Sequence, residues 1–182
     1  MSTAARNMGG NPGNGAVQAA APARRAAAAP LWLQLATLAL SLGGLGVSLY
    51  LTIAHYTTAA TLACPDTGVI NCEKVTTSPQ SVVFGIFPVA VLGLVFYVFM
   101  TAVNSPWAWR ADWPALRWAR LGALIAGIAF VLYLIYTELF TLDAICLWCT
   151  SVHAITFLLF AVVVPTAMAR PELGRSLPRR QP

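Results

Sequence analysis

Four long stretches without a charged residue constrain this chain more than any other feature of its sequence. No Asp, Glu, Lys or Arg occurs in residues 26–65, 75–109, 121–137 or 144–169. A helix that crosses a bilayer needs about 20 mostly apolar residues. The stretches therefore predict an all-α membrane protein in which four transmembrane helices form one bundle. Those helices are expected at 31–54, 84–103, 118–140 and 146–168.

The composition excludes most other classes of protein. Of the 182 residues, 58% are hydrophobic and 9% are charged, whereas a soluble domain carries about 25% charged residues. So few polar residues cannot cover a water-exposed globule, and the same numbers exclude a chain that is disordered throughout. No basic domain is visible, so we expect the lipid bilayer and no nucleic acid as the surroundings of this chain.

Positive charges indicate which side of the membrane each loop faces. All but one of the 11 Lys and Arg residues lie in the two tails or around the loop between the second and third spans. The exception is Lys74. We therefore expect both termini and the middle loop in the cytoplasm. The 55–83 loop and the turn near 140–145 are expected on the outer, periplasmic side of a multi-pass plasma-membrane protein.

The two ends of the chain lack the apolar pattern of the middle. Residues 1–29 are rich in Ala, Gly, Pro and Asn, and we expect a disordered cytoplasmic tail there. Residues 170–182, rich in Pro and Arg, are expected to form a second cytoplasmic tail. Residues 30–169 are then the membrane domain. The first span is expected to be retained, because a signal peptide has only roughly 7–15 apolar residues.

All four cysteines lie on the outer side of this topology. Cys64 and Cys72 are in the outer loop, and Cys146 and Cys149 begin the fourth span. Disulfides persist outside the cytoplasm. Two close pairs therefore indicate two disulfides or one set of exchanging thiols.

Cys146 and Cys149 form a C-x-x-C motif at a helix start. Asp143, three residues before Cys146, is expected to cap that helix. Unpaired N–H groups and the positive end of the helix dipole favour a thiolate at this position. A thiolate is the attacking species in disulfide exchange. A structural disulfide or half of a zinc site explains the motif taken alone equally well.

The loop pair leaves three interpretations open. Pro65, Gly68 and Asn71 are turn formers, so the loop can bend and bring Cys64 and Cys72 together. The pair is then a structural staple, a mobile dithiol that passes electrons to the helix pair, or part of a zinc site. Zinc is disfavoured, because structural zinc sites typically use more closely spaced pairs and the second pair lies in a membrane helix. We expect no metal.

Longer runs of sequence extend around both cysteine pairs. One run is Cys72-Glu73-Lys74-Val75-Thr76-Thr77-Ser78-Pro79-Gln80-Ser81, followed by Phe84-Gly85-Ile86-Phe87-Pro88 and Gly93. The other is Cys146-Leu147-Trp148-Cys149-Thr150-Ser151-Val152-His153. Together with the helix count and the topology, these runs resemble the vitamin K epoxide reductase family, its bacterial branch in particular. The resemblance covers roughly Leu31 to Met168.

The resemblance implies a fold and a relay. Four helices would surround a quinone, menaquinone or ubiquinone, under a cap made of the outer loop and a half-helix near Glu73–Ser81. A secreted thioredoxin-fold, DsbA-like protein would deliver its dithiol to the Cys64–Cys72 disulfide. Cys72 would then attack Cys146, and Cys149 would resolve the mixed disulfide and pass the electrons to the quinone of the membrane pool. The net reaction is that of a quinone-dependent thiol–disulfide oxidoreductase.

The electron donor is expected to be a separate polypeptide. Many bacterial relatives carry a fused thioredoxin-like domain after the last helix, whereas only residues 171–182 follow it here. Epoxide reduction, the activity of the animal proteins, is not implied by any residue of this chain.

Four further residues are candidates for the quinone site. His153 follows Cys149 by four residues on the same helical face, where it is expected to bond a quinone oxygen or carry its proton. Ser78 matches a Ser or Thr position of the family motif. Phe84 and Phe87 are expected to line the pocket. Ordinary helix packing is the alternative for the histidine and the two aromatic residues.

Two other features carry structural expectations. Glu138 and Asp143 bracket the outer turn and are expected to face water or cap a helix. The small residues of Gly43-Gly44-Leu45-Gly46 are expected to let helices approach closely in the membrane.

A non-enzymatic four-span scaffold with a structural disulfide in its outer loop is the alternative to an enzyme. Such a scaffold does not need Cys146 and Cys149 at a helix start. A small transporter would carry ionisable residues in mid-membrane, where only His55 and His153 near the outer end are candidates. The cysteine pairs therefore favour the enzyme.

Overall fold

The computed structural model describes residues 29–57, 62–111 and 113–168. It is mostly helical, as the charge-free stretches predict. The helices and strands, in chain order, are α1 (Leu31–Tyr56), α2 (Cys72–Thr76), η2 (Pro79–Ser81), β1 (Val82–Val83), β2 (Phe87–Pro88), α3 (Val89–Val103), α4 (Pro106–Arg110), α5 (Pro114–Thr137), η3 (Glu138–Leu142) and α6 (Leu147–Met168). The predicted tails, 1–29 and 170–182, lie outside the described residues except for Ala29.

Three segments of the described chain are long and apolar enough to cross a bilayer: α1, α5 continued by the π-helical turn η3, and α6. They agree with three of the four predicted spans. The remaining prediction, a span at 84–103, differs from the structure, because the helix found there, α3, has only 15 residues. Fifteen helical residues extend about 22 Å, less than the roughly 30 Å of a bilayer core.

The first residues of the predicted span, before α3 begins, form a β-hairpin instead of a helix. Strand β1 pairs antiparallel with β2, with Val83 opposite Phe87. Three residues separate the strands, and two of them, Phe84 and Gly85, have positive φ. The N–H of Ile86 donates to the carbonyl of Val83 at 3.2 Å and closes a tight turn around these two residues. The prediction of a helix from residue 84 is therefore wrong by five residues, because turn chemistry overrides the apolar pattern there.

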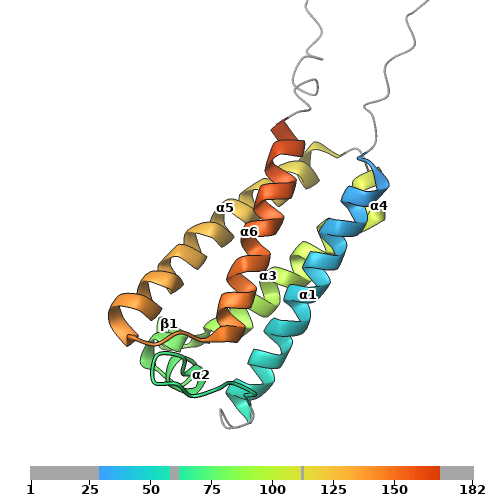
Figure 1. The fold of residues 1–182 in the computed structure, drawn as a ribbon. Helices are drawn as coiled ribbons and strands as arrows, with labels where there is room; N and C mark the ends of the chain where they lie inside the picture. The colour runs from blue at the N-terminus through green and yellow to red at the C-terminus, as the bar shows by residue number, and fades with distance from the viewer. Residues whose placement is uncertain (1–28, 58–61, 112, 169–182) are drawn as a thin grey trace, which may run out of the picture.

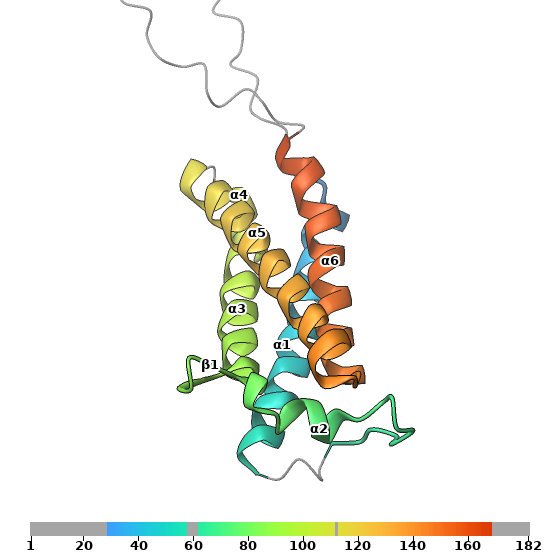
Figure 2. The ribbon, with the colours of Figure 1, turned by 90° about the vertical axis from the view of Figure 1, so that its left-hand side faces the viewer.

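The long helices form one bundle (Figure 1). α1 packs against α3 and α6, and α5 packs against α6. The start of α1 and the end of α6 lie at the same end of the bundle, and α2 and the hairpin lie at the opposite end. Figure 2 shows α2 lying across this second end, below the ends of α5 and α6 and beside the end of α1. The expected half-helix is thus two short helices, α2 and η2.

Close contact between α1 and α3 confirms the expectation for the glycine-rich segment. A Cβ at Gly44 would overlap the ring of Tyr97 on α3. Tyr97 is fully buried, its hydroxyl donates to the carbonyl of Val152, and it shares a 2.8 Å hydrogen bond with the Thr156 hydroxyl. Tyr97 therefore joins α1, α3 and α6 at one point in the middle of the bundle.

Candidate active site

The four cysteines lie at the α2 end of the bundle in two different redox states. Cys64 and Cys72 form a disulfide, with their Cα atoms 6.1 Å apart. Cys146 and Cys149 are free thiols. Neighbouring pairs that exchange electrons require one oxidised and one reduced partner, and this arrangement meets that requirement.

The N-cap of α6 is not the residue that the sequence predicts. Asp143 ends η3 in the left-handed conformation and does not cap α6. Cys146 itself takes the capping position, since its carbonyl accepts the N–H of Thr150 at 2.8 Å and its sulfur accepts the N–H of Cys149 at 3.3 Å. A side chain that accepts from the third helical residue is the usual N-cap arrangement. The reactive sulfur thus occupies the capping position directly.

These contacts favour the thiolate of Cys146. The pKa of Cys146 is lowered, first because the Cys149 thiol donates a hydrogen bond to its sulfur. Burial acts in the opposite direction on this pKa, as does the Glu138 carboxylate, while the backbone N–H groups of Cys149 and Trp148 lower it further. A lowered pKa leaves more thiolate at neutral pH.

We expect this ionisation to be measurable in a variant without loop cysteines, Cys64→Ala with Cys72→Ala. Ultraviolet absorbance of the thiolate should appear below the ordinary thiol pKa of about 8.5. Adding Cys149→Ala should move the transition to higher pH, because it removes the donor that lowers the pKa most. A transition at or above the ordinary value before that change would contradict the assignment.

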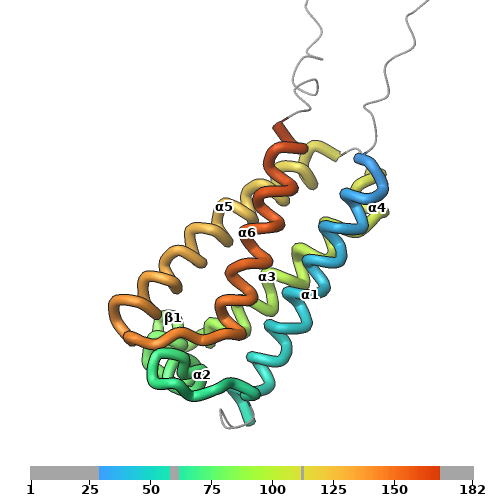
Figure 3. Tube along the Cα trace, viewed as in Figure 1, coloured from blue at the N-terminus to red at the C-terminus, as the bar shows by residue number. Residues whose placement is uncertain are grey.

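A short parallel β-bridge holds the two pairs together. Ile70 pairs with Ile145, the N–H of Ile145 donates to the carbonyl of Val69 at 2.8 Å, and the N–H of Asn71 donates to the carbonyl of Ile145 at 3.1 Å. The Cα trace in Figure 3 shows the loop before α2 beside the segment that leads into α6. The bridge ends one residue before Cys146 and two before Cys72.

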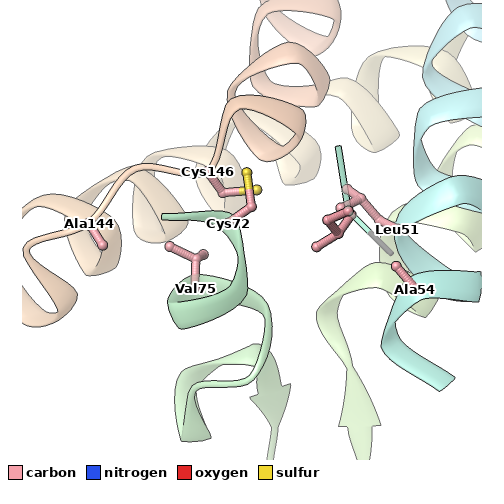
Figure 4. Close-up of a cluster of buried hydrophobic side chains, with 7 residues drawn as sticks. Leu51, Ala54, Cys72, Val75, Ala144 and Cys146 are labelled. Atoms are coloured by element: carbon pink, nitrogen blue, oxygen red, sulfur yellow. The ribbon is translucent and has the colours of Figure 1, made fainter. Parts of the chain in front are cut away.

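Cys72 and Cys146 meet in a buried apolar cluster. Both are almost fully buried, and they share this cluster with Leu51 and Val75 among others. Figure 4 shows the two cysteine side chains meeting between α2 and the start of α6. Cys64 is more exposed than Cys72. The inner loop cysteine therefore faces the helix pair, and the outer one is the more accessible to another protein.

The Cys64 end of the loop is held by two aromatic residues. The N–H of Ala63 donates to the Tyr50 hydroxyl at 3.0 Å, and the Trp148 indole donates to the Ala63 carbonyl at 3.1 Å. The two rings pack edge to face, with centroids 4.8 Å apart. Trp148, the third residue of the C-x-x-C motif, thereby ties the loop to α1 and α6.

A largely apolar cavity of about 360 Å³ lies beside Cys149, between α1, α3, α5 and α6. This volume is within the range of small-molecule sites. Among the predicted quinone residues, Ser78 and His153 line it. The Ser78 hydroxyl donates to the Val75 carbonyl at 2.8 Å. The structure thus brings Cys149, Ser78 and His153 to one cavity.

Phe84 and Phe87 do not line this cavity. Their side chains are 90% and 53% exposed on the hairpin. The reason is again the turn, because positive φ at Phe84 directs the chain outward, whereas a helix through this segment would have turned a face toward the bundle.

Two buried polar residues of the cavity wall, Ser48 and Glu138, are among those that were not identified from the sequence as site residues. Ser48 on α1 is buried, and its hydroxyl has no hydrogen-bond partner in the described part of the chain. Glu138, expected to face water or cap a helix, is only 6% exposed and lines the cavity. Its position at the end of an apolar run was a usable signal, because an ionisable residue within a membrane segment is by default functional.

A helical bundle with three helices of membrane-spanning length, in which a disulfide lies against a dithiol beside an apolar cavity, has the features expected of a membrane oxidoreductase of disulfides. The model of the vitamin K epoxide reductase family matches residues 35–164, more than half of the chain. The chain belongs to this family, whose enzymes are oxidoreductases that are in general linked to a quinone. No curated protein matches the chain.

Proposed function

We propose that the protein oxidises the dithiol of a secreted thioredoxin-fold, DsbA-like protein and passes the electrons to a membrane quinone, menaquinone or ubiquinone. One observation carries the proposal. The Ile70–Ile145 bridge holds the loop disulfide against the start of α6, where Cys149 faces an apolar cavity. This arrangement, together with membership of the family, supports the proposed partner, quinone and reaction.

The orientation belongs to the same proposal. Both termini lie in the cytoplasm, and the cysteines lie on the periplasmic side of the plasma membrane. The distribution of Lys and Arg supports this orientation. The arrangement of α1 and α6 is consistent with it, because the start of one and the end of the other lie at the end of the bundle opposite the cysteines.

Electrons move between the pairs by thiol–disulfide exchange. The partner's dithiol reduces the Cys64–Cys72 disulfide, with Cys64 as the accessible sulfur. The Cys72 thiolate then attacks Cys146 of the oxidised helix pair, forms a Cys72–Cys146 bond and releases Cys149 as a thiolate. Cys64, and not Cys149 as the family resemblance implied, then resolves this bond, because attack by Cys149 on Cys146 would return the electrons to the loop. Cys64 attacks Cys72, which restores the loop disulfide and releases Cys146. The result is a loop disulfide beside a helix dithiol, the combination found in the structure.

The cavity fits a quinone headgroup. Its wall is mostly apolar, and Ser48 places in it a buried hydroxyl that has no hydrogen-bond partner among the described residues. A hydroxyl in such a position is stabilised by a ligand oxygen, because a buried polar group without a hydrogen bond costs about 1–3 kcal/mol. A bound quinone supplies an acceptor for two electrons and two protons. Ser48, Ser78 and His153 would hold it, and Cys149 is the cysteine that faces it.

The test uses purified full-length protein, a soluble ubiquinone or menaquinone analogue and a reduced DsbA-like protein. We expect the quinone to be reduced as the partner loses its thiols. Cys146→Ser should lower the rate to that of the mixture without enzyme, because it removes the sulfur that links the two pairs. Ser151→Ala, on the exposed face of the same helix, should retain activity. A Cys64–Cys72 disulfide that stays oxidised while no quinone is reduced would indicate a structural staple instead.

A further inference from the structure

Glu138 is a buried carboxylate that the exchange reactions described above do not use. The other carboxylates of the described chain, Asp66, Glu73 and Asp143, are exposed. Glu138 stands at the first position of the π-helical turn η3, where α5 ends. Single π-turns within helices occur frequently at functional sites. A charged group in this place is costly and calls for a specific role.

The contacts of Glu138 point to the helix pair. Its carboxylate accepts a hydrogen bond from the backbone N–H of Cys146. It also interacts electrostatically with the thiols of both Cys146 and Cys149. The same side chain lines the cavity beside Cys149. Glu138 therefore contacts the segment that carries one thiol and shares the cavity wall with the other.

Oxidation of the helix pair must release two protons. Formation of the Cys146–Cys149 bond removes two electrons and two protons from the two thiols. The proton of Cys146 leaves most easily, as a consequence of its capping position. Cys149 lines the cavity, so its proton is placed to leave on the cavity side.

We propose that the Glu138 carboxylate accepts the proton of Cys149 when the helix dithiol is oxidised. In this step the S–H bond of Cys149 breaks and an O–H bond forms on Glu138. The sulfur then bonds to Cys146, and two electrons leave to the oxidant. The oxidant is the quinone if the proposed function holds. The proposal rests on the proposed function only in naming this oxidant. The other titratable groups that line the cavity, besides Cys149 itself, are His55, Tyr97 and His153.

The kinetic test needs no quinone. In the variant Cys64→Ala with Cys72→Ala, dithiodipyridine oxidises the reduced helix pair, and the release of thiopyridone gives the rate. We expect Glu138→Gln to slow this oxidation about 10²-fold at neutral pH, the size of a general-base contribution. The loss should shrink as the pH rises, because hydroxide then takes the proton. Glu138→Asp should restore part of the rate.

An equilibrium measurement separates this role from a structural one. The amide side chain introduced by Glu138→Gln can still accept the Cys146 N–H but carries no charge. The thiolate of Cys146 should therefore form at lower pH in this variant, because the carboxylate that opposes it is gone. Oxidation becomes slower while the thiolate becomes easier to form. Damage to the turn would instead slow oxidation and move the thiolate to higher pH, which would overturn the proposal.

Glu73→Gln is the matched control, since it makes the same chemical change on an exposed residue of α2. It should leave both measurements unchanged. A wild-type oxidation rate and pH profile in Glu138→Gln would also overturn the proposal. If His153→Gln, and not Glu138→Gln, gives the pH-dependent loss, the proton acceptor is the histidine and the proposal is wrong. Failure of wild-type protein to reduce a quinone would count against the proposed function and would leave these two measurements valid.

Discussion

Replacing Cys149 with Ala is expected to accumulate a Cys72–Cys146 disulfide and to lower turnover to below ~1% of wild type, as removal of one member of a catalytic unit does. Without Cys149, the Cys146 thiolate attacks the loop disulfide at Cys72, the sulfur it meets in the buried cluster. This exchange releases Cys64 as a thiol and needs no oxidant. Cys149 is then absent and cannot attack Cys146 to break the new bond.

The remaining route back is attack by the released Cys64, and this route can be closed. Cys64 is the more exposed loop cysteine, so slow alkylation with N-ethylmaleimide should cap it and fix the Cys72–Cys146 bond in the population. Peptide mapping without reductant should then show this disulfide as the dominant species, with Cys64 alkylated or joined to the partner protein. Wild-type protein treated in parallel should keep the Cys64–Cys72 bond. A dominant Cys64–Cys146 species would reverse the roles of the loop cysteines, and no bond between the pairs would contradict the relay.

The three long apolar segments were predictable from the sequence. Charge-free stretches gave α1, α5 with η3, and α6 to within about five residues, because an apolar segment of that length has few alternatives to a membrane helix. The motif C-x-x-C placed Cys146 at a helix start, since the apolar run begins there. The prediction that Asp143 caps this helix was wrong, because Asp143 takes the left-handed conformation that ends η3.

The predictions that were wrong or missing concern features that depend on contacts between distant segments or on turn geometry. An apolar run through residues 84–103 fits a helix and a hairpin equally well, and the turn at Phe84 and Gly85 decides between them. The burial of Glu138 depends on the backbone of Cys146, which η3 brings back to it. Hydropathy along the chain reports no such contact. The Ile70–Ile145 bridge, which joins the two cysteine pairs, could not be predicted from the sequence for the same reason.

Replacing Gly44 with Ala should destabilise the bundle more than any other single-methyl change at a described glycine. The added Cβ would overlap three ring carbons of Tyr97. The ring cannot swing aside cheaply, because it is fully buried and its hydroxyl is held by Val152 and Thr156 on α6. Overpacking a core typically costs about 1–3 kcal/mol, and we expect the upper end of that range or more.

Gly46→Ala is the matched control two residues along the same helix, since a Cβ there meets nothing within 4 Å. It should leave stability unchanged or raise it by up to about 1 kcal/mol through helix propensity. Thermal unfolding in detergent compares the two variants directly. In a Tyr97→Leu background the cost of Gly44→Ala should largely disappear, because residues in contact are not additive. Equal effects at Gly44 and Gly46, or an undiminished cost in the Tyr97→Leu background, would show that α1 and α3 do not meet through this pair. The cost is therefore a measure of how closely α1 and α3 approach beside the cavity that holds Cys149.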